Sequence, residues 1–144
     1  MQKNVNEDME ALMKYRLGRS KEDIEAAKLL IKNNSLYGAN NRVYYAVFHA
    51  ILAVQSNDNI NSKRHGQIIG EFNRNYIKTN IFPKDLGRQI DKIQSIRHSS
   101  DYDDFYIPDK QETKQNIKIA EEIVKVAEKY LTDEFNIKIE DDQR

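Results

Sequence analysis

The chain of 144 residues contains no cysteine and no tryptophan, and it has only 2 prolines, 5 glycines and 3 histidines. The absence of cysteine excludes disulfides, thiolate metal sites and cysteine nucleophiles. Because glycine and proline are scarce, long uninterrupted helices are expected and a β-sandwich with many tight turns is disfavoured. No two histidines lie three or four residues apart, so we expect neither a metal site nor a cofactor.

The sequence also lacks a hydrophobic stretch long enough to cross a membrane. Its most apolar run covers residues 44–54, where only His49 interrupts the hydrophobic side chains, whereas a bilayer span needs about 20 residues. The first nine residues are polar and contain no apolar core of the secretory kind. We therefore expect a cytoplasmic protein that does not enter a membrane, with residues 44–54 in the buried central helix of a bundle.

Apolar residues recur at three- and four-residue spacing along five segments, which indicates amphipathic helices. The expected helices cover residues 7–32, 35–56 with Ser35 as N-cap, about 63–79, 85 to about 99, and about 109–135. Gly18 and Ser20 would allow a break in the first helix, but its apolar stripe continues past them, so one helix is expected.

Joined by short loops, these helices predict an all-α fold, an antiparallel up-and-down bundle of four to five helices. A chain of this length forms one domain with a core of its own. We expect that domain to span residues 1–144, with its core at about 7–135 and a frayed tail at 136–144.

The charges are balanced overall but segregated along the chain. There are 23 basic and 23 acidic residues, yet residues 62–98 carry 8 basic and 3 acidic groups, and residues 99–144 carry 7 and 13. Overall neutrality argues against a protein that coats nucleic acid non-specifically. The basic segment is either an ordinary solvated helix surface or a face for phosphate or a partner.

Arg97 breaks the apolar pattern of the fourth expected helix. It lies seven residues after Ile90 and four after Ile93, so it points toward the bundle or toward a partner. Asp101 follows four residues later, within reach of the guanidinium if the helix continues, and Tyr102 comes next. Two interpretations remain open: a half-buried Arg–Asp clamp, or an arginine that binds phosphate or takes part in catalysis.

The three histidines occupy different environments. His98 is rotated by about 100° from Arg97 on a helix, which predicts a surface position. His49 lies inside the apolar run, as a hydrogen-bonded core residue or a functional one. His65 opens the third helix beside Lys63 and Arg64, where free helical amides could hold an anion, or where it is only a polar first-turn residue.

Two further features concern contacts between elements. Asn41 shares a helical stripe with Tyr45 and Phe48, so we expect a buried amide that needs a partner, either to tie two helices together or to bind a ligand. The segment 100–108 is acidic and aromatic. It suits contact with a basic partner surface better than direct contact with nucleic acid.

Three stretches of the chain, taken in order, carry a family resemblance. They are AAKLLIKNNSLYGANNRVYYAVFHAIL at 26–52, SKRHGQIIGEFNRNYIKTNIFPKDLGRQIDKI at 62–93 and IRHSSDY at 96–102. The first two resemble the paired-helix core of the HEPN family of small helical-bundle proteins, with its Tyr-Tyr and Phe-His pairs and its Lys-x-His segment. The third stands where the defining motif of that family stands, and the resemblance extends from about residue 15 to residue 131.

The resemblance implies a bundle that forms homodimers, here through the third to fifth helices. It also implies a gene beside a minimal nucleotidyltransferase, in a toxin–antitoxin or antiviral defence module. Active members of the family are metal-independent ribonucleases in which an arginine, followed four to six residues later by a histidine, comes from both protomers. Arg97 corresponds to that arginine and would stabilise the charge that develops on the phosphorane.

The family histidine has no counterpart at the matching positions, which hold Asp101, Tyr102 and Asp103. The chain therefore resembles the branch that reads Arg-x-x-x-Asp-Tyr. Tyrosine is a poor general base at neutral pH, so Asp101, or His98 of the other protomer, would have to move the proton. The resemblance further implies that a nucleotidyltransferase could modify a tyrosine close to the motif, either Tyr102 or Tyr106.

Two functions follow from these observations. The first is a ribonuclease toxin whose catalytic residues are Arg97, Asp101 and Tyr102. The second is a non-catalytic module that binds a nucleotidyltransferase, a nucleotide or an RNA end. The binding residues expected for such ligands are Asn41, His49, Lys63, His65 and His98.

Overall fold

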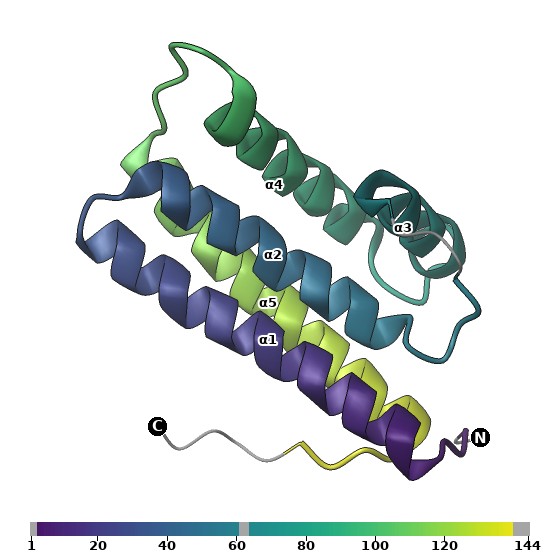
Figure 1. Ribbon diagram of the computed structural model, residues 1–144. Helices are drawn as coiled ribbons and strands as arrows, with labels where there is room; N and C mark the ends of the chain where they lie inside the picture. Colours follow the sequence, from purple (N-terminus) through teal and green to yellow (C-terminus); the bar gives the residue numbers. More distant parts are fainter. Residues whose placement is uncertain (1–2, 61–63, 140–144) are drawn as a thin grey trace.

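The protein is an all-helical bundle in its computed structural model, which describes residues 3–60 and 64–139. The elements are α1 (Glu7–Lys32), α2 (Leu36–Val54), α3 (His65–Phe72), a π-helical turn η1 (Asn73–Ile77), α4 (Lys84–Tyr102) and α5 (Lys110–Phe135). Helices α1, α2 and α5 pack side by side, and α4 lies along α2 on its other side (Figure 1). The predicted all-α bundle of four to five helices is confirmed.

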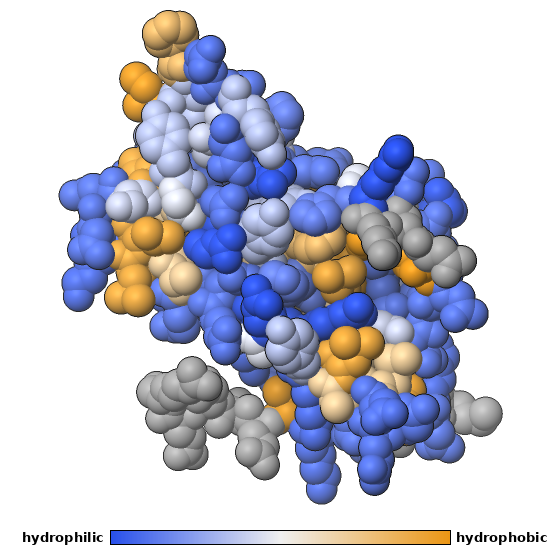
Figure 2. Space-filling view, viewed as in Figure 1, coloured by the Kyte–Doolittle hydropathy of each residue, from blue (hydrophilic) through white to orange (hydrophobic). Residues whose placement is uncertain are grey.

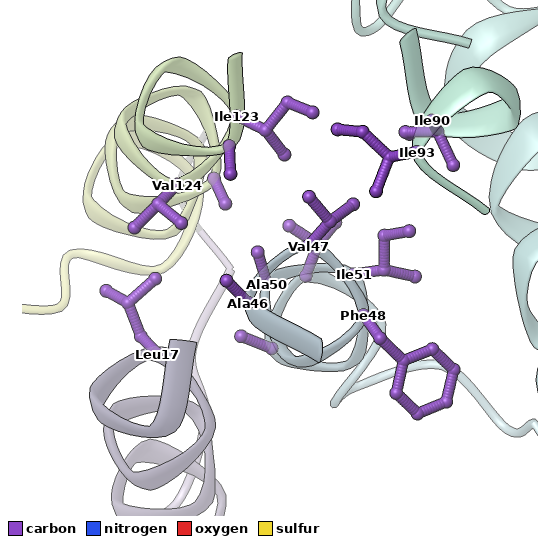
Figure 3. Packing of buried hydrophobic residues seen from close by; sticks show 14 of the residues in the cluster. Leu17, Ala46, Val47, Phe48, Ala50, Ile51, Ile90, Ile93, Ile123 and Val124 are labelled. Carbon is purple, nitrogen blue, oxygen red and sulfur yellow. The ribbon is translucent and has the colours of Figure 1, made fainter. Parts of the chain in front are cut away.

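Helix α2 is the centre of the molecule, as its apolar sequence predicts. It contacts α1, α3, α4 and α5. Val47 and Ile51 of α2 are buried between α4 and α5, and Leu17 of α1 lies on the opposite side of α2 (Figure 3). Phe48 points away from this centre (Figure 3), toward His65 at the start of α3, on whose ring it stacks.

Helix α1 is a single unbroken helix, as its continuous apolar stripe predicts. The Asn6 side chain caps it by accepting a hydrogen bond from the Met9 amide at 2.8 Å. Acidic residues in the first turn interact favourably with the positive end of the helix dipole. Ser20 is fully buried, and its hydroxyl donates to the carbonyl of Ala46. This polar contact helps to fix the register of α1 against α2.

The third predicted helix differs from the structure. The chain is helical from His65 to Ile77, close to the expected 63–79, but α3 ends at Phe72 and the last five residues form the π-helical turn η1. A bond from the Lys78 amide to the Asn73 carbonyl at 2.9 Å closes this turn. The Tyr76 hydroxyl donates to Asp58 at 2.5 Å. Lys63, an expected binding residue, lies outside the described residues.

The end of α4 also differs from the prediction. The helix continues to Tyr102, three residues past the expected end near residue 99, because an i, i+4 ion pair between Arg97 and Asp101 supports the last turn. Ser35 stands at the N-cap of α2 but makes no capping hydrogen bond with its side chain. Beyond α5, Ile137 is buried in the core, and residues 140–144 lie outside the described range.

Candidate functional site around Arg97

Arg97 lies near the end of α4 and faces three tyrosines. Its guanidinium carbon is 4.8 Å from the ring centre of Tyr44, 5.6 Å from that of Tyr45 and 5.7 Å from that of Tyr102. A cation over an aromatic face is attracted by the ring quadrupole, and the Nη2 group also donates to the Tyr45 hydroxyl at 3.3 Å. The side chain is only 18% exposed, so the guanidinium is held in one place.

Asp101 supplies the carboxylate that Arg97 needs. Its Oδ2 atom lies 3.0 Å from Nε of Arg97, which is the ion pair that the four-residue spacing predicts. The Nε atom of Arg97 is nevertheless buried without a hydrogen bond among the described residues, so the contact is a charge pair rather than a two-pronged clamp. The guanidinium therefore keeps donors that Asp101 does not use.

The contacts of Asp101 continue into helices α2 and α1. Asp101 accepts a hydrogen bond from Asn41 at 3.0 Å, and Asn41 in turn accepts from Arg42 at 2.7 Å. Arg42 donates to Oδ1 of Asp23 at 3.0 Å, and Oδ2 of Asp23 lies 2.8 Å from Nδ1 of His49. We call this series the polar chain. Its members are His49, Asp23, Arg42, Asn41, Asp101 and Arg97, from helices α2, α1 and α4.

His65, the first residue of α3, packs against the aromatic rings of Tyr44, Tyr45 and Phe48. Its Nδ1 atom lies 3.0 Å from the Tyr44 hydroxyl, and its ring stacks on Phe48 with 4.0 Å between the centres. Burial lowers the pKa of His65, and electrostatic interaction with Arg97 and with His49 lowers it further. Burial raises the pKa of Tyr44 to about 12. At neutral pH, the His65–Tyr44 pair is therefore uncharged.

The structure agrees with the predicted position of His98 but not with that of Asn41. His98 is exposed and its ring lies 5.0 Å from that of Tyr102, consistent with the predicted surface position. The prediction that the Asn41 amide is buried is wrong: the side chain is only partly buried, and it donates a hydrogen bond to Asp101 at the surface. The buried amide belongs to Asn40, which donates to Ser100 and accepts from Thr113, each at 3.0 Å.

Asp23, Tyr44 and Tyr45 are site residues that the sequence did not reveal. Asp23 offers one signal, because it occupies the buried stripe of α1 beside Ile24 and Ala27 and is only 4% exposed. A carboxylate on an apolar stripe needs a buried partner. The two tyrosines have no physical signal of this kind, since aromatic residues in an apolar run are the expected core; the sequence marks them only as the Tyr-Tyr pair of the family resemblance.

The loop after α4 is the most exposed hydrophobic part of the described chain. Phe105 is 100% exposed and Ile107 is 84% exposed, and hydrophobic atoms gather at the tip of this loop (Figure 2). The Tyr37 hydroxyl donates to the Tyr106 carbonyl at 2.6 Å and ties the loop to α2. Phe105 has a φ angle of 64°, a left-handed conformation that a bulky residue rarely adopts.

The strain at Phe105 gives a stability prediction. Replacing Phe105 with glycine should raise the free energy of unfolding by about 1 kcal/mol, because glycine adopts a positive φ without steric cost. Ile107→Gly is the matched control: it also removes an exposed apolar side chain from the loop, but Ile107 has no positive φ, so its variant should gain no stability. Urea unfolding followed by circular dichroism measures both, and equal stability of Phe105→Gly and the parent would contradict the account.

Two general observations bear on how the site could work. Among the residues that the structure describes, no helix combines the length and hydropathy that a membrane span requires. Within the same residues, no three histidine or acidic side chains cluster as a metal site would require. The residues brought together are a partly buried arginine, a carboxylate, tyrosines and two histidines, in a small all-α bundle.

Comparison with known proteins supports the family resemblance. The HEPN domain matches residues 13–130. A "UPF0332 protein" of Thermotoga maritima is 30% identical over 126 residues, which cover 88% of this chain and 96% of the relative. The chain therefore belongs to the HEPN family.

Two relatives from Methanocaldococcus jannaschii carry names that refer to toxins. "Putative toxin MJ0605" is 30% identical over 102 residues, covering 71% of this chain and 73% of the relative. "Putative toxin MJ0142" is 26% identical over 124 residues, covering 86% of this chain and 84% of the relative. The protein is thus a HEPN-domain chain similar to proteins named as toxins.

Proposed function

We propose that the protein is the toxin of a toxin–antitoxin or defence module and that it cleaves RNA without a metal ion at the site around Arg97. The observation that carries this proposal is the state of the Arg97 side chain. Three tyrosine rings and Asp101 fix the guanidinium, yet among the described residues only its Nη2 atom donates a hydrogen bond. The Nη1 group of Arg97, unlike the buried Nε atom, is not among the buried unpaired atoms, so its N–H groups are available to phosphate oxygens.

The reaction has three requirements that this site would meet in part. Arg97 would stabilise the negative charge on the phosphorane, since a fixed cation acts most strongly where charge develops. Asp101 and Tyr102 would hold the guanidinium in position. The third requirement is a group that takes the proton of the ribose 2′-hydroxyl, and positions 101–103 contain no histidine for this role.

The test is incubation of the purified protein with RNA in the presence of EDTA. We expect cleavage that leaves a 2′,3′-cyclic phosphate on one fragment and a 5′-hydroxyl on the other, because the 2′-oxygen is the nucleophile. Recovery of intact RNA after prolonged incubation would contradict the proposal. A heat-denatured sample of the same preparation controls for uncatalysed hydrolysis.

A second function is favoured by one observation, the direct contact of Asp101 with Arg97. A carboxylate beside the guanidinium offsets its charge and repels phosphate. Under this alternative the protein is a non-catalytic module that binds a nucleotidyltransferase, a nucleotide or an RNA end near Asn41, His49 and Arg97. Intact RNA in EDTA, together with measurable binding of such a ligand, is the result that would favour it.

The proposed assembly is a homodimer that a nucleotidyltransferase antitoxin controls. Exposed aromatic side chains at the end of α4 and in the following loop support a partner surface there, since Tyr102 is 64% exposed and Phe105 fully exposed. Tyr102 is the more accessible candidate for modification, because Tyr106 is partly buried. A strictly monomeric mass in solution at micromolar concentration would contradict a site built from residues of both protomers.

A further inference from the structure

His49 has the environment of a residue that transfers protons. Its Nδ1 atom lies 2.8 Å from Oδ2 of Asp23, and Asp23 is only 4% exposed. A buried carboxylate beside Nδ1 keeps the proton of a neutral imidazole on that nitrogen and leaves Nε2 with a free lone pair. The same carboxylate stabilises the imidazolium that forms when Nε2 accepts a proton.

The orientation of the Asp23 carboxylate is itself fixed. Its second oxygen, Oδ1, accepts a hydrogen bond from Arg42 at 3.0 Å, and the Arg42 guanidinium lies 5.0 Å from the ring centre of Tyr45. Two residues of α2 thus hold the carboxylate of Asp23, which belongs to α1: Arg42 contacts one oxygen and His49 the other. This arrangement restricts the rotation of the imidazole ring.

The Nε2 atom of His49 is open on the side away from Asp23. Among residues 3–60 and 64–139, Nε2 makes no hydrogen bond. It is also absent from the buried polar atoms that lack a partner, so it is accessible to solvent. The side chain is 16% exposed. A substrate hydroxyl could therefore reach this nitrogen.

Tyr45 links His49 to the arginine. The rings of Tyr45 and His49 have centres 6.1 Å apart, and the Tyr45 hydroxyl accepts a hydrogen bond from Nη2 of Arg97. The charge of Arg97, and that of His49 when it is protonated, lower the pKa of His65, so the two histidines and the arginine lie in one neighbourhood. The ring of Tyr45 thus lies in contact distance of both groups that the reaction requires.

We propose that His49, oriented by Asp23, is the base that accepts the ribose 2′-hydroxyl proton in the RNA cleavage proposed above, on which this inference rests. As Nε2 takes the proton, the 2′-oxygen forms a bond to phosphorus and the bond from phosphorus to the 5′-oxygen breaks. The leaving 5′-oxygen takes a proton from water, and the imidazolium returns its proton to solvent. The products are a 2′,3′-cyclic phosphate and a 5′-hydroxyl.

The other candidate bases are less suited to this role. The Nδ1 atom of His65 meets a tyrosine hydroxyl instead of a carboxylate, and the charge of Arg97 opposes protonation of its ring. His98 is exposed, with its ring against Tyr102 on the outside of the bundle. Oδ2 of Asp101 is already engaged by Arg97 and Asn41.

The test compares His49→Ala with the parent under single-turnover conditions in EDTA. We expect the cleavage rate to fall by about a hundredfold or more, RNA binding to persist and the acidic limb of the pH–rate profile, where a general base becomes protonated, to change. Added imidazole should restore part of the rate, which a merely structural role would not allow. Leu52→Ala, a partly buried position one turn further along α2, controls for lost packing and should show no response to imidazole.

The outcomes separate this inference from the proposed function. If the parent cleaves RNA and His49→Gln, which keeps the size and polarity of the side chain, cleaves at the parental rate, the role of His49 is wrong and the ribonuclease function stands. Loss of rate and imidazole rescue in His65→Ala, but not in His49→Ala, would likewise overturn it. If the parent itself does not cleave RNA, both proposals fail.

Discussion

Replacing Arg97 with alanine is expected to slow RNA cleavage by about a hundredfold to a thousandfold, the range seen when one fixed donor to a developing oxyanion is removed. The side chain is only 18% exposed and contacts three tyrosine rings, so its position is set before substrate arrives. Arg97→Lys keeps the charge but loses the planar fork of donors. We expect the lysine variant to recover only part of the parental rate.

The matched control for Arg97→Ala is Arg88→Ala. Arg88 lies on the same helix, but its side chain is 80% exposed and pairs only with Asp85 among the described residues. Its removal should leave cleavage unchanged. A cleavage rate in Arg97→Ala equal to that of the parent, measured with folded protein, would show that the guanidinium has no part in the reaction.

The second large effect is expected on stability, in Asp23→Ala. Asp23 is the buried counter-charge of Arg42 and the hydrogen-bond partner of His49. Removing one member of a buried charged group leaves the other uncompensated, which costs about 3 kcal/mol or more. Asp23→Asn keeps the volume of the side chain and one acceptor oxygen, so its loss of stability should be smaller.

Urea unfolding followed by circular dichroism measures these losses. Asp91→Ala on the exposed face of α4 removes a carboxylate that has no ion pair among the described residues, and its effect should stay within about 0.5 kcal/mol. An Asp23→Ala variant as stable as Asp91→Ala would mean that the Asp23 contacts contribute nothing net. The polar chain would then have no structural role at its α1 end.

Much of the fold could be predicted because helical periodicity is local. The apolar run at 44–54 predicts a central helix, and α2 is buried against α1, α4 and α5. The π-helical turn at Asn73–Ile77 could not be predicted in the same way. It depends on contacts from elsewhere in the chain, among them the bond between Tyr76 and Asp58.

The same division applies to the site. The Arg97–Asp101 pair follows from a spacing of four residues on one helix, so the sequence predicts it. The Asp23–His49 contact joins residues 26 positions apart, and it depends on how α1 and α2 are aligned. Helical periodicity places each residue on a face of its own helix, but it does not say which residues of two helices meet.

The most direct test of the central claim is cleavage, in EDTA, of a short RNA in which the nucleotide at the cut site carries a 2′-deoxy sugar. The account requires the 2′-oxygen as nucleophile, with Arg97 on the phosphate. The parent should therefore cut the all-ribose RNA and leave the substituted bond intact. Cleavage of both substrates at similar rates would contradict the account, because the reaction would then proceed without the 2′-hydroxyl.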